Sequence, residues 1–125
     1  HLLSRRQRQM CIRDREIQSV FYNNKYVGIS YSDTKKENSW HIKVYDMNGK
    51  TVMENDTEIA YNRIELLDNN EICVRDDYNC ELFTIHSIRK FRYTFDRQLY
   101  NVLSGSDGQN YTLVLNGEIE EVRLQ

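Results

Sequence analysis

The amino-acid sequence predicts an all-β protein made of four-stranded antiparallel blades, arranged as a partial β-propeller. After residue 16, short runs rich in Val, Ile, Tyr, Phe and Thr alternate with polar residues and end in Asn, Asp or Gly, which is typical of strands and turns. Helical periodicity is nearly absent from this stretch. The strand pattern recurs at about 40 residues, the length of a four-stranded propeller blade. We therefore expect about two and three-quarter blades, at 17–55, at 61–95 and from 99 onwards.

The strands are expected where apolar residues recur with a period of two. Val27, Ile29 and Tyr31 share one face of such a run, because successive side chains of a strand point to opposite faces. The predicted strands are approximately 17–22, 25–32, 40–46, 50–55, 61–67, 71–76, 80–86, 89–95, 99–104, 110–115 and 118–124. In the last run Ile119 is out of phase with Val122, which predicts a β-bulge near residues 120–121.

Two hairpin turns can be predicted from their residues. Asn48-Gly49 and Asn116-Gly117 fit two tight turns, since Asn tolerates turn conformations and Gly adopts positive φ without a steric cost. We expect these turns to join 40–46 to 50–55 and 110–115 to 118–124 as antiparallel hairpins.

The predicted blades correspond to one another by pattern more than by identity. The correspondences are 26–30 with 71–75 and 110–114, 41–45 with 81–85, and 50–52 with 90–92. The third blade contains only three strands, so we expect a fourth strand from an upstream part of the parent chain to complete it.

Residues 5–15 match an in-frame translation of a transposase sequencing adapter over their whole length. We therefore interpret residues 1–15 as a non-native segment that does not belong to the fold, and residues 16–125 as the C-terminal fragment of a propeller-like domain. The alternative is that this segment is a basic amphipathic arm.

Charge argues against nucleic acid as the partner of the β-domain. Residues 1–15 hold five of the 17 basic residues and one of the 19 acidic residues, which leaves 12 basic and 18 acidic residues and a net charge of −6 in 16–125. A domain of this sign lacks the positive surface that binds phosphate backbones. A nucleic-acid-binding alternative rests only on the N-terminal arginines Arg5, Arg6, Arg8 and Arg13. No apolar run of about 18 residues, as a membrane span requires, is present.

The cysteines and histidines do not form a recognisable metal motif. Cys11 lies in the adapter-like segment, and Cys73 and Cys80 flank a predicted turn, so they can face each other across a strand pair. We expect two free, half-buried thiols, with a disulfide between them as the alternative. The three histidines have no spacing that suggests zinc: His1, His41 and His86.

No catalytic or cofactor motif is found, and no metal, cofactor or enzymatic activity is expected. The adjacent acids Asp76-Asp77 and Glu120-Glu121 are interpreted as turn and edge residues, because neighbours on a strand point to opposite faces. Calcium binding at residues 68–71 is a weaker alternative, since the run has too few oxygen ligands for a recognisable loop.

Five aromatic residues form the candidate binding rim. Tyr and Trp are enriched at interfaces, although they are equally common within sheets, where we expect most single rings to pack. The candidate rim consists of Trp40, Tyr22, Tyr45, Tyr78 and Tyr100. His41, next to Trp40, is expected to be exposed on a sheet.

Four segments carry a resemblance to a known family: IQSVFYNNKYVGISYSD, VYDMNGKTV, CELFTI and EIEEVRL. They resemble an uncharacterised family of Gram-positive bacterial proteins over residues 16–125. The resemblance implies an N-terminal transmembrane helix upstream of this chain and a propeller-like repeat domain on the extracytoplasmic face of the cell membrane. It implies no activity and no catalytic residues.

Together these observations predict a non-catalytic binding or scaffold module of a membrane-anchored bacterial protein. A protein or a cell-wall glycan is the expected partner, because propellers present loop-built rims. The alternative is a fragment of a propeller enzyme whose catalytic groups lie in missing blades.

Overall fold

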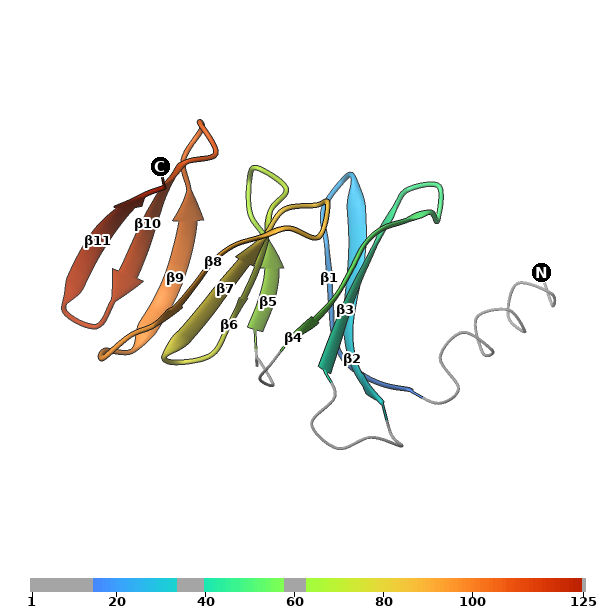
Figure 1. The fold of residues 1–125 in the computed structure, drawn as a ribbon, viewed down its shortest axis with the longest axis horizontal. Helices are drawn as coiled ribbons and strands as arrows, with labels where there is room; N and C mark the ends of the chain where they lie inside the picture. The colour runs from blue at the N-terminus through green and yellow to red at the C-terminus, as the bar shows by residue number, and fades with distance from the viewer. Residues whose placement is uncertain (1–14, 34–39, 58–62, 125) are drawn as a thin grey trace, which may run out of the picture.

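The computed structural model describes residues 15–33, 40–57 and 63–124, and all regular structure in these residues is β. Eleven strands form three antiparallel sheets, so the predicted all-β class is confirmed (Figure 1). The residues of the adapter-like segment before Arg15 lie outside the described part of the chain.

Each sheet is a meander of consecutive strands, as the blade pattern predicts. The first sheet contains β1 (Arg15–Tyr22), β2 (Tyr26–Asp33), β3 (Trp40–Asp46) and β4 (Thr51–Thr57). The second contains β5 (Arg63–Leu66), β6 (Ile72–Arg75), β7 (Asn79–Phe83) and β8 (Arg89–Thr94). The third contains β9 (Leu99–Ser104), β10 (Asn110–Leu115) and β11 (Glu118–Arg123).

The largest difference from the predicted strand boundaries is at the end of β7. This strand was expected to continue to residue 86 but ends at Phe83. The hydroxyl of Thr84 accepts hydrogen bonds from the backbone N–H groups of His86 and Ile88, each at 3.2 Å, and so forms a turn. Such local side-chain bonds compete with the strand ladder.

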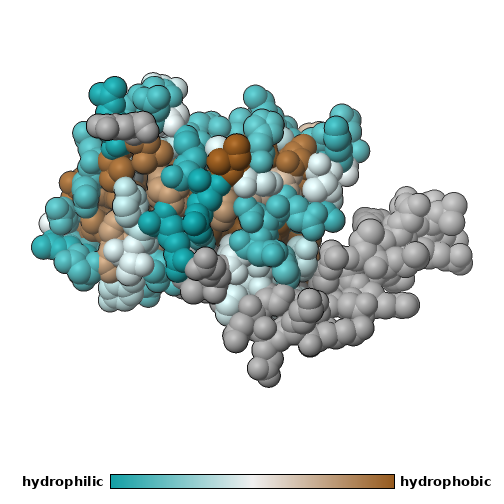
Figure 2. All heavy atoms as spheres, in the orientation of Figure 1, coloured by the Kyte–Doolittle hydropathy of each residue, from teal (hydrophilic) through white to brown (hydrophobic). Residues whose placement is uncertain are grey.

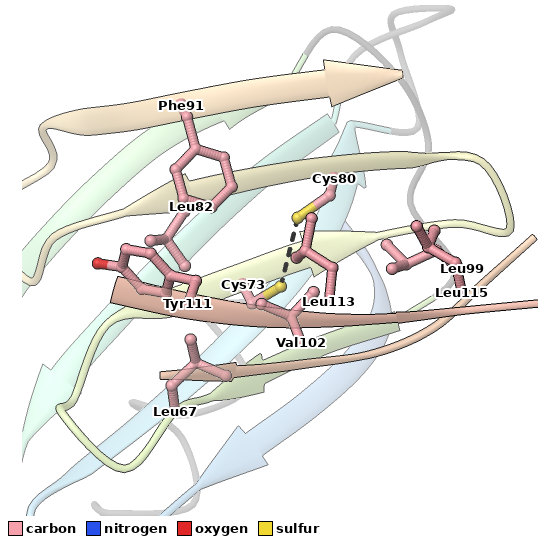
Figure 3. Packing of buried hydrophobic residues seen from close by; sticks show 10 residues of the cluster. All are labelled: Leu67, Cys73, Cys80, Leu82, Phe91, Leu99, Val102, Tyr111, Leu113 and Leu115. Atoms are coloured by element: carbon pink, nitrogen blue, oxygen red, sulfur yellow. Dashed lines mark hydrogen bonds between the residues drawn. The ribbon is translucent and has the colours of Figure 1, made fainter. Parts of the chain in front are cut away.

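The second sheet lies between the other two and is covered on both faces (Figure 1). We call its contact with the first sheet the first seam and its contact with the third sheet the second seam. The first seam buries Phe21, Ile42, Val44 and Met53 against Ile72, Val74 and Phe83. The second seam buries Leu67, Cys73, Cys80, Leu82 and Phe91 against Leu99, Val102, Tyr111, Leu113 and Leu115 (Figure 3). All four residues of β6 are buried because alternate side chains enter opposite seams.

Both predicted hairpins are confirmed, with glycines in the left-handed region. Gly49 has φ +83° between β3 and β4, and Gly117 has φ +79° between β10 and β11. The Asp46 carboxylate supports the first turn by accepting hydrogen bonds from the N–H groups of Asn48 and Lys50 at 2.9 and 3.0 Å.

The bulge predicted near residues 120–121 is wrong. The pairing of β10 with β11 runs without interruption from Asn110↔Arg123 to Leu115↔Glu118. Ile119 is out of phase because it points away from the second seam and is 71% exposed. Ile119 is an apolar residue on the outer face of the third sheet, so its position in the sequence pattern does not require an extra residue in the strand.

The blade correspondence is confirmed at the second strands and wrong by two residues at the third and fourth. Tyr26, Glu71 and Asn110 each accept, through the backbone carbonyl, the hydrogen bond that closes the preceding turn. The β3–β4 and β7–β8 hairpins each contain a shift in pairing register, at Val44/Tyr45 and at Leu82/Phe83. These two positions are 38 residues apart, whereas we expected corresponding residues to be 40 apart. The turns that follow agree, since Ser87 has positive φ (+70°) at the position of Gly49.

The outer faces of the first and third sheets carry exposed apolar side chains. On the first sheet Val20 and Tyr22 are 60% and 76% exposed, and on the third sheet Leu103 and Ile119 are 49% and 71% exposed. Hydrophobic residues are visible on the third sheet at the left of Figure 2, among hydrophilic neighbours. Within the described ranges, the chain has no helix long and apolar enough to cross a membrane.

Candidate functional site

A pocket opens at one end of the second seam, between the β6–β7 turn and the connection from β8 to β9. These two turns lie at the lower edge of the ribbon in Figure 1. The volume of the pocket is about 260 Å³. The side chains that line it are mostly polar: Arg63, Arg75, Asp76, Asp77, Gln98 and Tyr100. We call this cavity the Arg75 pocket.

Hydrogen bonds of the turns fix the walls of the Arg75 pocket. The Asp76 carboxylate accepts hydrogen bonds from the backbone N–H groups of Tyr78 and Asn79 at 2.9 and 2.7 Å, which closes the β6–β7 turn. This turn is joined to the third sheet because the Leu99 N–H donates to the Asp77 carbonyl at 2.7 Å. A rigid frame of this kind positions the lining side chains before any ligand arrives.

Two arginines face the pocket from neighbouring strands. Arg63 on β5 is paired directly with Arg75 on β6, so both side chains lie on the same face of the second sheet. The Arg75 side chain is only 5% exposed, and its Nε donates to Glu65 Oε1 at 3.4 Å. Within the described part of the chain Arg63 forms no ion pair, and the terminal nitrogens of Arg75 have no hydrogen-bond partner. Like charges placed directly opposite each other destabilise a sheet.

At the opposite end of the second seam, a lysine is fully paired with groups of the same chain. Lys90 Nζ donates to Glu71 Oε2 at 2.6 Å, to the Tyr111 hydroxyl at 2.8 Å and to the Gly108 carbonyl at 2.5 Å. The Tyr111 hydroxyl donates in turn to the other oxygen of Glu71. We call these residues the Glu71–Lys90–Tyr111 network, and it joins the second sheet to the third.

The network raises the pKa values of Lys90 and Tyr111. Burial lowers the pKa of Lys90, but the hydrogen bonds to Glu71 and Tyr111 outweigh this effect, so the pKa is raised above its usual 10.5. Burial and the hydrogen bond to Glu71 raise the pKa of Tyr111 above 10.0. Both protonated forms are therefore stabilised in the folded state.

Cys73 and Cys80 are free and fully buried in the second seam, with 3.7 Å between their sulfur atoms (Figure 3). The expectation of free thiols is confirmed, but that of half-burial is wrong, because the third sheet covers the face from which both project. The hydrogen bond to Cys80 and burial raise the pKa of the Cys73 thiol well above its usual range. A protonated, buried thiol is a poor nucleophile.

The structure divides the predicted aromatic rim into three groups. Tyr22 and Tyr45 flank Val27 across neighbouring strands on the outer face of the first sheet. Trp40 lies at the opposite end of β3 from Tyr45. Tyr78, in the β6–β7 turn, and Tyr100, on β9, are about half exposed at the lower end of the second seam. Tyr100 alone among the five lines the Arg75 pocket.

The sequence interpretation missed Arg63, Arg75 and Gln98 as candidate site residues. The available signal was a single arginine on each of two neighbouring predicted strands, which is unremarkable without the register. Only the pairing of β5 with β6 and the approach of the third sheet bring these side chains to one cavity.

Three of the other polar candidates, Asp76, Glu71 and His41, are engaged within the fold. Asp76 closes its turn, and both oxygens of Glu71 belong to the Glu71–Lys90–Tyr111 network. His41 is half-buried, not exposed as expected, because its ring stacks on Tyr31 with 5.1 Å between centroids and its Nδ1 lies 2.5 Å from Asp56. In the described ranges no three His, Cys, Asp or Glu side chains are grouped as a metal site requires.

Comparison with known proteins gives one family. The model of a family of unknown function, DUF5711, matches residues 4–124. The matched range covers all three sheets and also most of the segment that we interpret as adapter-derived. No curated protein matches the sequence.

Proposed function

We propose that this chain, which belongs to the DUF5711 family of unknown function, is a non-catalytic binding module. Its ligand would bind in the Arg75 pocket. This proposal is based on a cavity whose frame is fixed by hydrogen bonds of the turns, while several of its lining side chains have no hydrogen-bond or ion-pair partner among the residues that the structure describes. Binding sites commonly combine a preformed concave wall with a few convergent polar groups.

The position of the pocket supports the same function. It lies where loops and strand ends of two sheets meet, which is where rigid β scaffolds present variable residues for recognition. Tyr100 lines the pocket, and Tyr78 follows the lining residue Asp77 in the β6–β7 turn, so we retain these two residues of the predicted aromatic rim in the proposal.

We further propose that the module belongs to a membrane-anchored bacterial protein and is held on the extracytoplasmic face, with protein or cell-wall glycan partners. The exposed apolar faces of the first and third sheets support its placement within a longer stack of blades, because contiguous apolar faces mark contact surfaces. The catalytic-propeller alternative would require convergent groups from other blades.

A binding experiment with isotope-labelled protein tests the proposed function. Small soluble peptides and neutral and acidic oligosaccharides are titrated while backbone amide signals are followed. Ligand-dependent shifts should concentrate at Gln98, Leu99 and Tyr100, and Tyr100→Ala should weaken binding about tenfold, the effect of losing roughly 1.4 kcal/mol. Tyr22→Ala, an exposed tyrosine on the first sheet, is the matched control and should bind as the parent does. Shifts confined to another surface would contradict the proposal.

A further inference from the structure

Two arginines and two aspartates, Asp76 and Asp77, line the Arg75 pocket, so its formal charge is balanced. The Asp76 carboxylate is engaged by the β6–β7 turn, whereas the two guanidinium groups are not fully engaged, and this difference points to the class of ligand. Arg75 is a buried cation whose one carboxylate partner, Glu65, is at 3.4 Å and touches only Nε. Its terminal nitrogens and the whole Arg63 guanidinium have no hydrogen-bond partner within the described residues. A buried charge without full hydrogen bonding is costly, so a site that keeps one is a candidate for binding an ion of opposite sign.

The cross-strand pairing strengthens this argument. Arg63 and Arg75 are directly opposite each other, and their mutual repulsion is relieved by an anion placed between the two guanidinium groups. Arginine is suited to this role because its planar fork of N–H donors matches a carboxylate or a phosphate in a bidentate arrangement. At the other end of the same seam, Lys90 is fully engaged by Glu71 and Tyr111, so an incompletely paired cation is not a general property of this fold.

The remaining lining residues indicate that the anion is part of a saccharide. Gln98 and Asp77 add a donor and an acceptor whose side chains form no hydrogen bond within the described part of the chain. Tyr100 is 47% exposed as a residue, and its aromatic ring can pack against the C–H face of a sugar ring. A cavity of about 260 Å³ is small and suits one ring better than an extended peptide.

We propose that the Arg75 pocket binds an acidic saccharide unit, with its carboxylate or phosphate between Arg63 and Arg75 and its ring against Tyr100. This inference rests on the proposed binding function and specifies its ligand. Asp77 and Gln98 would then contact hydroxyl groups of the ring. The net charge of −6 in residues 16–125 disfavours long polyanions, so selectivity comes from the pocket and not from the overall field.

The test uses four probes at constant ionic strength: glucuronate, glucose, acetate and glucose 6-phosphate. Amide and arginine side-chain signals of the whole chain are followed by NMR during each titration. Glucuronate should bind with a dissociation constant on the order of 1 mM, as expected for a single sugar ring, and should shift the signals of Arg63, Arg75, Gln98 and Tyr100. Glucose 6-phosphate, as a second acidic probe, reports whether carboxylate and phosphate are both accepted; binding by either acid supports the proposal.

Two variants of the exposed arginines isolate the contribution of charge. Arg63→Gln should weaken glucuronate binding at least tenfold and leave the unfolding midpoint close to that of the parent, because Arg63 is exposed. Arg97→Gln removes the same charge at the same end of the molecule, but Arg97 is paired with Glu118 at 3.6 Å outside the pocket lining, so binding should be unchanged.

Each contrary result overturns a defined part of the proposal. Glucose binding as tightly as glucuronate would exclude the role of the anion, and acetate binding as tightly would exclude the saccharide. If Arg63→Gln binds glucuronate as the parent does, or if no acidic probe binds, the anion site is wrong. The proposed function would survive such a failure if a neutral ligand still shifted Gln98 and Tyr100, and it would fail with the inference if no ligand reached these residues.

Discussion

Gly28 shows how a single residue position is set by its neighbour across the sheet. It pairs with Phe21, and both lie on the face that forms the first seam. A Cβ atom added to Gly28 would lie 2.2 Å from Cζ of the Phe21 ring, far inside van der Waals contact. The absent side chain therefore leaves the space that the aromatic ring fills.

Substitution of Gly28 should consequently destabilise the protein. Gly28→Ala should cost about 1–3 kcal/mol of unfolding free energy, because the Phe21 ring must leave its position in the seam. Urea denaturation measures the cost. In a Phe21→Ala background the same change should cost much less, since the two residues share one space. Equal costs in both backgrounds would show that the ring is not the obstacle.

Gly49 illustrates a different requirement, which is backbone conformation. Its φ is +83°, and no atom lies within 4 Å of a Cβ built on it, so space is not limiting. Gly49→Val should still cost more than about 1 kcal/mol, because a β-branched residue is strained at positive φ. Met47→Val, an exposed change in the same turn, controls for the effect of valine itself. Unfolding midpoints that agree between the two variants would argue against strain at Gly49.

At the scale of elements, the Glu71–Lys90–Tyr111 network joins the second and third sheets through charge. The pKa values of Lys90 and Tyr111 are raised in the folded state above 10.5 and 10.0. The folded protein therefore retains protons that the unfolded chain loses, and its stability falls as pH rises. The contribution is complete below about pH 10 and is lost as pH rises through the folded-state values.

Removal of the lysine should remove part of the stability, and removal of both titrating groups should also remove this pH dependence. Lys90→Met should lower the unfolding free energy by about 1–3 kcal/mol at pH 8, because it leaves the buried Glu71 without its cation. Between pH 9 and 11.5, roughly the range around these pKa values, the parent should lose stability more steeply than a Lys90→Met, Tyr111→Phe double variant, which lacks both groups. Parallel curves for the two proteins would place the alkaline transition elsewhere.

At the scale of the whole molecule, net charge decides which partners the β-domain attracts. Residues 16–125 carry a net charge of −6, while the preceding segment carries five arginines. A deletion of residues 1–15 should therefore show no salt-sensitive binding to a labelled DNA duplex, since phosphate repels an acidic surface. The whole chain can bind weakly through Arg5, Arg6, Arg8, Arg13 and Arg15.

Titration of both forms at two salt concentrations measures this difference. A loss of binding on deletion assigns any affinity to the N-terminal arginines. Micromolar or tighter binding by the deleted form would favour the nucleic-acid-binding alternative over an extracytoplasmic module.

Local patterns in the amino-acid sequence were sufficient to predict the strands and two of the turns. The period-two alternation located all eleven strands, and the Asn-Gly pairs located two turns with positive φ. These features could be predicted because side-chain alternation and turn conformation depend on residues close in the chain. The recurrence of the pattern likewise predicted three blades of four, four and three strands.

The contacts of each sheet face could not be predicted in this way and became clear from the packing of the sheets. In the third and fourth strands of the first two blades, the residues that correspond are two positions away from those that we predicted. Cys73 and Cys80 are fully buried, although we expected half-burial. The tertiary structure also placed Arg63 opposite Arg75 and brought Tyr100 to the same cavity from another sheet. The physical reason is that register and sheet stacking are set by packing between residues far apart in the chain, which no local pattern encodes.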